Sequence, residues 1–228
     1  MMTGMNKNDY DVRVDINDDI LSDVSLVTIG IVRDIIRTRV GRGKADAMAI
    51  SFQLAKDKVR KWIKMGHVSV LEHFVFSFDI SLSRVASHQI VRHRIASYTQ
   101  ETLRVKHDFS TENIIIPPQI DDSDLNEWIH DMLQSFELYK KWLEKGYNRD
   151  VVRRFLPSGI RTGLRMTINA RSLRNLFEQR LAKVADFEIR NIAERMVGLL
   201  FSRGYGFLFE DIPLVKKVIN KTKTLTNE

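Results

Sequence analysis

The stretch QIVRHRIASYTQETLR, residues 89–104, places two arginines and a histidine in a row and follows them with hydroxyl and amide side chains. The cationic run is Arg92, His93 and Arg94, and the stretch ends on Arg104. A solvated surface can carry such a run, but a planar guanidinium also forks onto the oxygens of a phosphate group. The stretch therefore predicts either an exposed basic surface or part of a site that holds an anionic ligand.

A second arginine-rich segment follows at residues 149–180. It holds eight arginines and no lysine, namely Arg149, Arg153, Arg154, Arg161, Arg165, Arg171, Arg174 and Arg180. Solvated faces take either residue, whereas only arginine can fork onto phosphate or a pyrimidine carbonyl. We predict that residues 84–104 and 149–180 form walls of one anionic-ligand site. For any single arginine, the alternative is a surface ion pair with an acid elsewhere.

The composition limits the chemistry that such a site can perform. The chain has no cysteine, which excludes disulfides, thiolate metal ligands and a cysteine nucleophile. Its histidines form no H-E-x-x-H pair, so we expect no metal. The glycine-rich phosphate cradles of nucleotide-binding proteins are absent from the sequence too. Any phosphate group must therefore be held by side chains.

Length and charge bound the organisation of the chain and its partners. At 228 residues and 43% hydrophobic, it is expected to form a single domain over residues 1–228, with a flexible tail at 221–228. The net charge of +7 favours anionic partners. No apolar run of about 18 residues occurs and the N-terminus carries no apolar signal segment, so we expect a cytoplasmic protein with no membrane partner.

Hydrophobic periodicity predicts a mixed α and β protein dominated by helices. A helix is expected within residues 46–66, where Met48, Phe52, Ala55, Val59 and Trp62 share one face. The other predicted elements are strands at 73–82 and 159–168 and helices at 83–94, 123–146, 170–180 and 184–202. The cationic run then lies at the C-terminal end of the helix 83–94.

Four motifs, in order across residues 65–190, resemble the flavin-dependent thymidylate synthases. They are HVSVLEH (67–73), RHRIASYTQETLR (92–104), RRFLP (153–157) and NARSLRNLFEQR (169–180). The resemblance implies that family's α+β fold, with a helix-rich subunit and a small antiparallel sheet. It also implies a homotetramer whose active sites are each built from several subunits. It also implies a methyltransferase that converts dUMP to dTMP with methylenetetrahydrofolate as one-carbon donor, reduced FAD as hydride source and NADPH as reductant. No cysteine is needed for that route, and no nucleic-acid partner is expected.

The resemblance assigns residues position by position. Arg180 matches the active-site arginine that contacts the pyrimidine. The residues that match dUMP contacts are Gln89, Ile90, Val91, Arg92, Gln100, Glu101, Thr102, Leu103, Arg104, Arg153 and Arg180. The residues that match FAD contacts are His67, Ser69, Glu72, Arg92, His93, Arg94, Gln100, Asn169, Arg171 and Asn175.

Each assignment has a structural alternative. Ser69 can cap a helix, Asn169 and Asn175 can bridge backbone groups, and His67 or His93 can be core histidines. Burial of Glu72 would require a partner, for which an arginine of residues 92–104 is the candidate.

The sequence departs from the family pattern at Thr102, Leu103, Val105 and Val184. These departures affect nucleotide choice and folate binding, so a methylase of another uridine nucleotide, such as UMP, is one alternative. A flavin-dependent oxidoreductase without methyl transfer is another. A basic nucleic-acid-binding protein without catalysis is the third, with Tyr98 stacking on a base.

Overall fold

The computed structural model describes residues 12–16, 23–104 and 108–225, and their contacts divide into two compact units. Unit 1 consists of residues 12–14, 79–92, 98–104 and 108–165. Unit 2 consists of residues 15–16, 23–78, 93–97 and 166–225. The chain passes between the units several times, and the expectation of a single domain stays a prediction.

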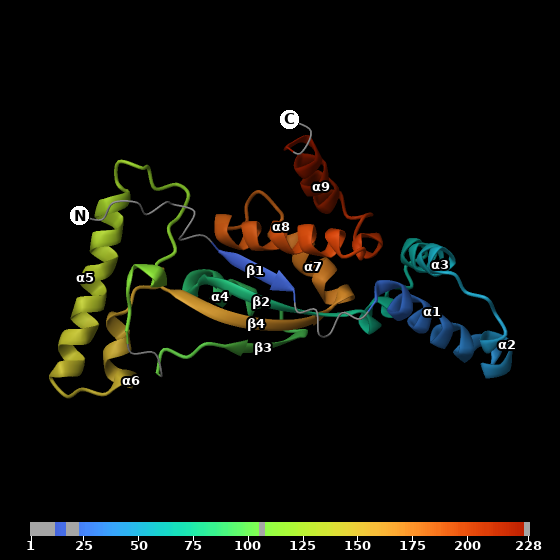
Figure 1. Cartoon of the computed structure of the whole chain (residues 1–228), viewed down its shortest axis with the longest axis horizontal. Coiled ribbons are helices and arrows are strands. Elements are labelled where there is room, and N and C mark those ends of the chain that lie inside the picture. The colour runs from blue at the N-terminus through green and yellow to red at the C-terminus, as the bar shows by residue number, and fades with distance from the viewer. Residues whose placement is uncertain (1–11, 17–22, 105–107, 226–228) are drawn as a thin grey trace. The chain divides into compact units, whose positions relative to one another are not determined.

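The fold is α+β, as predicted, and has one four-stranded antiparallel sheet (Figure 1). The strand order is β1-β2-β4-β3. The bounds are β1 Arg13–Ile16, β2 Val75–Ser83, β3 Ala96–Gln100 and β4 Arg161–Asn169. In β4 the even-numbered residues are buried in alternation with more exposed neighbours, which is the period of two that predicted this strand.

Unit 1 is built around the long helix α5 (Leu125–Glu144), which buries Ile129, Met132, Phe136 and Tyr139 as its periodicity predicted. The helix ends where Gly146 adopts a positive φ of 89°, a conformation that glycine reaches without strain. The other helical segments of unit 1 are α4 Arg84–Ile90, η3 Thr111–Asn113, α6 Arg149–Val152 and η4 Arg153–Phe155. Helix α6 packs beside α5 (Figure 1).

Helix α4 ends earlier than predicted. Ser83 caps it by accepting a hydrogen bond from the backbone N–H of Ala86, and Ile90 is its last residue. The cationic residues Arg92, His93 and Arg94 therefore lie beyond the helix, in the short connection to β3. Strand β3 itself was not predicted.

Unit 2 is mainly helical and packs around aromatic residues of β2. Phe76 is completely buried, and its ring centroid lies 5.1 Å from that of Tyr205 and 6.2 Å from that of Phe209. The helical segments are α1 Val24–Val40, α2 Arg42–Asp46, α3 Phe52–Lys64, η2 Val68–His73, α7 Ala170–Arg180, α8 Phe187–Ser202, η5 Gly206–Leu208 and α9 Pro213–Leu225. Helix α8 packs against both α7 and α9, and α7 also contacts α9 (Figure 1).

One expectation in unit 2 is corrected. Met48 does not belong to the amphipathic helix, because Ser51 caps α3 by accepting from the backbone N–H of Leu54. Residues 221–225 continue α9, residues 226–228 lie outside the described part, and the expectation of a flexible tail at 221–228 stays a prediction. In the described segments, no helix combines the length and the apolar character that crossing a lipid bilayer requires.

Candidate functional site

The predicted substrate loop, residues 100–104, is fastened to unit 1 by its first two residues. The side-chain amide of Gln100 donates to Ser87 Oγ at 3.0 Å. Glu101 makes two contacts to Gly163 of β4, because its backbone N–H donates to the carbonyl oxygen and its Oε2 accepts from the N–H, each at 2.9 Å. The start of the loop is therefore held by the side-chain hydrogen bond from Gln100 to Ser87 and by the two hydrogen bonds between Glu101 and Gly163.

The remaining loop residues differ in where their side chains go. Leu103 is buried in a cluster with Ile114, Ile116, Ile129, Met132, Phe136 and Ile160. That placement explains the apolar residue at this position, and it means that only the backbone of Leu103 can face a nucleotide. Thr102 Oγ accepts from the backbone N–H of Arg104 at 3.2 Å, which shapes the turn. Val105 lies outside the described residues.

Two arginines from different motifs meet on one carboxylate of unit 1. Arg104 Nε lies 2.6 Å from Asp150 Oδ1, and an Nη of Arg153 lies 3.3 Å from the same oxygen. Arg149 donates to the carbonyl oxygen of Arg104 at 3.2 Å. A single carboxylate oxygen thus gathers two guanidinium groups in the way that a phosphate oxygen would. Sequence reasoning missed Asp150, although its position among three arginines was visible.

The stretch 89–92 is shaped by a tyrosine that the sequence did not identify as structural. The Tyr98 hydroxyl donates to the carbonyl oxygen of Ile90 at 3.0 Å, and burial raises its pKa to about 12. Ile90 itself is completely buried. The side chains of Gln89, Val91 and Arg92 are partly or fully exposed, so they, with the Ile90 backbone, form the accessible part of this stretch.

In unit 2, the active-site candidate Arg180 contacts the middle residue of the cationic run. Arg180 is the last residue of α7, and its Nε donates to His93 Nε2 at 3.0 Å. His93 is 8% exposed. Burial first, and the Arg180 charge second, lower the pKa of His93 to about 4, so the ring is neutral near pH 7. His93 is thus a buried histidine that interacts with the predicted catalytic group.

The predicted FAD residues of unit 2 divide into accessible groups and groups with structural roles. Arg171 pairs with Glu72 at 2.5 Å, and each side chain is about half exposed. The predicted partner of Glu72, an arginine of residues 92–104, was wrong, and Glu72 is not buried. Asn169 caps α7 by accepting from the backbone N–H of Ser172 at 2.9 Å.

Other members of that set are exposed on the surface of unit 2. His67, Ser69, Arg94 and Asn175 all fall in this class, so His67 is no core histidine. Asn175 accepts a hydrogen bond from the side chain of Gln179. Val184, one of the departures from the family pattern, is 96% exposed in the turn between α7 and α8.

Three arginines of the second segment, Arg161, Arg165 and Arg174, have structural partners within their own units. Arg165 forms a two-pronged pair with Asp79, both contacts being 2.7 Å. Arg174 forms another with Asp211, at 2.6 Å for each contact, and also donates to a backbone carbonyl. Arg161 donates to Ser81 Oγ and to two backbone carbonyls. Arg165 and Arg174 thus form the ion pairs that were the alternative for single arginines, and the prediction that residues 84–104 and 149–180 form walls of one anionic-ligand site stays a prediction.

The described residues suit anionic organic ligands better than a metal ion. Within the described ranges, no group of three histidine, cysteine, aspartate or glutamate side chains is arranged to hold a metal. FAD carries a pyrophosphate, and the exposed guanidinium groups of Arg94 and Arg171 in unit 2 fit such a group. In unit 1, Arg104 and Arg153 fit a phosphomonoester.

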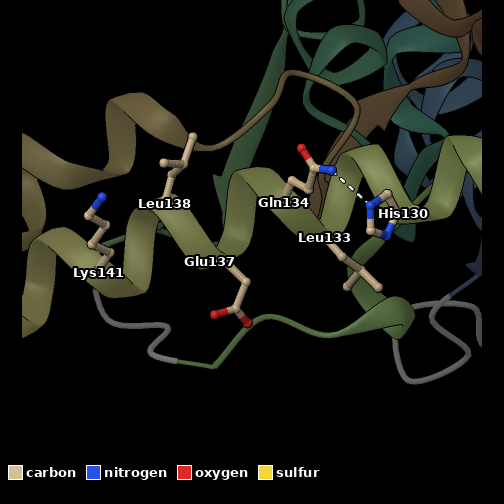
Figure 2. A pocket seen from close by; sticks show the side chains of 6 residues that line it. All are labelled: His130, Leu133, Gln134, Glu137, Leu138 and Lys141. Carbon is tan, nitrogen blue, oxygen red and sulfur yellow. Dashed lines mark hydrogen bonds between the residues drawn. The ribbon is translucent and has the colours of Figure 1, made fainter.

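A separate hollow of about 600 Å³ lies along α5 in unit 1 (Figure 2). It is lined by His130, Leu133, Gln134, Glu137, Leu138 and Lys141. None of the predicted site residues lines it, and all six lining residues belong to one helix. We therefore do not assign the candidate site to this hollow.

Comparison with known proteins agrees with the motif pattern. The family model described as thymidylate synthase complementing protein matches residues 29–202. The flavin-dependent thymidylate synthase of Pyrococcus abyssi is 41% identical over 138 residues, which is 58% of this chain and 57% of the relative. That of Sulfolobus acidocaldarius is 40% identical over 151 residues, or 64% of this chain and 58% of the relative. The chain thus spans less than two thirds of the length of these relatives.

Two solved structures share the fold. Thymidylate synthase X from Helicobacter pylori, determined with FAD and dUMP, is 25% identical, with a TM-score of 0.64 over 80% of this chain and 93% of that one. The UMP/dUMP methylase PolB from Streptomyces cacaoi, bound with 5-Br dUMP, is 19% identical, with a TM-score of 0.70 over 90% of this chain and 97% of that one. At 19% identity the likeness to PolB concerns the fold alone. Because the family model covers most of its length, the chain belongs to the thymidylate synthase complementing protein family.

Proposed function

We propose that this protein is a flavin-dependent thymidylate synthase that converts dUMP to dTMP. The observation that carries the proposal is the convergence of Arg104 and Arg153, from two separate motifs, on one oxygen of Asp150. Two guanidinium groups that already share an anionic oxygen are suited to hold the phosphate of a nucleoside monophosphate. Family membership and the relatives named above support the same reaction.

In this proposal, the chain binds and orients the reactants. Arg180 contacts the pyrimidine and stabilises its anionic form, because a guanidinium stays protonated at any working pH. Arg104 and Arg153 hold the phosphate, while Gln100 and Glu101 keep the substrate loop on unit 1. Reduced FAD, when bound, supplies the hydride. The absence of cysteine fits this division of labour, since no thiolate has to add to the pyrimidine ring.

Further parts of the proposal are more specific. Methylenetetrahydrofolate is the one-carbon donor, NADPH reduces the flavin, and Arg94 and Arg171 contact FAD. The protein acts in the cytoplasm as a homotetramer whose subunits share active sites. The dense positive charge of residues 84–104 and 149–180 supports the assembly of subunits or the binding of anionic ligands, because like charges repel unless partners neutralise them.

The first experiment loads the purified protein with FAD and records its absorption between about 300 and 550 nm before and after addition of dUMP. We expect flavin bands that shift with dUMP, and thymidylate formation once methylenetetrahydrofolate and NADPH are added. UMP is tested in parallel, and faster methylation of UMP would redirect the substrate assignment. A protein that takes up no flavin and does not respond to dUMP would contradict the proposal.

Arg180→Lys tests the assignment of the active-site residue. We expect this variant to keep FAD and to lose most turnover, because an ammonium group cannot fork onto two ring atoms. Arg39→Lys, an exposed change on α1 of the same unit, is the matched control and should retain turnover. Turnover of Arg180→Lys equal to that of the control would remove Arg180 from its assigned role.

A further inference from the structure

We infer that His93 is a positioning residue for Arg180: its Nε2 accepts the Nε–H of Arg180 and fixes the direction of that guanidinium. The inference rests on the proposed function, in which Arg180 contacts the pyrimidine. It gives His93 a role that differs from the flavin contact expected from the sequence. Both residues belong to unit 2.

The geometry supports a directional hydrogen bond. The two nitrogens lie 3.0 Å apart, within the usual range for a bond of this kind. Arg180 ends α7, while His93 lies in the connection between α4 and β3, so the contact joins two segments far apart in the sequence. Because Nε belongs to the rigid guanidinium plane, an acceptor at Nε restricts the orientation of the whole group.

The contact requires a neutral imidazole. A ring nitrogen that accepts from arginine carries no proton, so the single ring proton must be on Nδ1. Burial and the charge of Arg180 lower the pKa of His93 to about 4, which keeps the ring in this form near pH 7. A protonated ring would offer no acceptor at Nε2 and would repel the guanidinium. The same arginine thus favours the state of the histidine that holds it.

Two amide substitutions at His93 distinguish the effect of losing the hydrogen-bond acceptor from the effect of losing the volume of the imidazole ring. Glutamine places an amide near the position of Nε2 and can keep the acceptor, whereas asparagine reaches only as far as Nδ1. We expect His93→Asn to lower kcat for dUMP methylation by about 10- to 100-fold, because small misplacements of a reacting group have effects of that order. His93→Gln should stay within about fivefold of the wild-type kcat.

A double-mutant cycle in the FAD-loaded protein tests whether His93 acts through Arg180. In the Arg180→Lys background, His93→Asn should change kcat by less than about twofold, because the group that it positions is already gone. FAD affinity, measured by fluorescence titration, should be similar in all four proteins of the cycle. Effects that multiply independently, or a loss of FAD affinity that follows His93 alone, would overturn the inference.

The tautomer of His93 provides a readout that needs neither ligand nor turnover. Long-range 1H–15N spectra of the wild-type protein near pH 7 should show the His93 proton on Nδ1, with sequence-specific assignment of the wild-type resonances identifying the signal. A proton on Nε2, or a charged ring, would overturn the inference even if the amide variants do not fold. The proposed function fails separately, if the wild-type protein binds neither FAD nor dUMP.

Discussion

Removal of the Asp150 charge should strengthen the binding of dUMP. Asp150 Oδ1 lies 2.6 Å from Arg104 Nε and 3.3 Å from an Nη of Arg153, and both arginines are assigned to the nucleotide phosphate. The carboxylate and the phosphate therefore compete for the same N–H groups. In Asp150→Asn the guanidiniums no longer have to leave a charged partner when the nucleotide arrives.

The size of the effect follows from the exposure of the three side chains. Arg104 is 62% exposed, Asp150 52% and Arg153 36%. Exposed pairs of this kind contribute about 0.2–1 kcal/mol each, so the two together amount to about 0.4–2 kcal/mol. Asparagine keeps an oxygen that can accept a hydrogen bond, which favours the lower part of that range. We therefore expect dUMP to bind about twofold to tenfold tighter.

Isothermal titration of the FAD-loaded protein with dUMP at fixed ionic strength measures this change. Asp131→Asn is the matched control, because Asp131 is an exposed acid of α5 in the same unit and its removal changes the net charge equally. The affinity of Asp131→Asn for dUMP should stay near the wild-type value. Binding by Asp150→Asn that is weaker than that of the control would show that Asp150 orients the arginines and does not compete with the phosphate.

Three further predictions test other contacts. Thr102→Ser keeps the hydroxyl that accepts from Arg104 and should keep kcat/KM within about threefold, whereas Thr102→Val should lower it by about tenfold or more. Phe76→Ala should lower the free energy of unfolding in urea by about 3–5 kcal/mol, against under about 0.5 kcal/mol for the exposed Val75→Ala. Pairing with Arg165 lowers the pKa of Asp79, so its stabilisation is present above pH 3.8 and lost as the pH falls through the lower folded value. Asp79→Asn should thus lower the free energy of unfolding by up to about 1 kcal/mol at pH 7 and progressively less under acid, and a deficit unchanged by acid would contradict that account.

The sequence predicted those elements whose local signals agree with their final environment. Helix α7 has the predicted bounds because Asn169 caps it and its apolar positions recur at helical spacing. Strand β4 alternates along its whole length. In α7 and in β4, the local propensity and the burial pattern agree, so the sequence of each segment is sufficient to predict its secondary structure.

Strand β3 and the end of helix α4, which the sequence did not predict, lack such agreement. Strand β3 has the sequence ASYTQ, and none of its residues is fully buried, so it shows no apolar alternation. Helix α4 ends at Ile90 without a glycine or proline, and the turn that follows is instead fixed by the hydroxyl of Tyr98. This contact depends on β3 bringing Tyr98 back to the end of α4, and the sequence pattern within α4 contains no information about that.

Arginine density was informative about the site only in part, because bidentate ion pairs use the same side chain as phosphate binding does. Arg165 and Arg174 each meet an aspartate through two nitrogens, which fixes the plane of the guanidinium. Arg104 and Arg153 instead share one oxygen of Asp150, an exposed carboxylate that an incoming anion can replace. The sequence shows how many arginines are present, but the aspartates that pair with Arg165 and Arg174 come from distant segments. The geometry of each pair therefore separates arginines that stabilise the fold from arginines that are suited to bind a ligand.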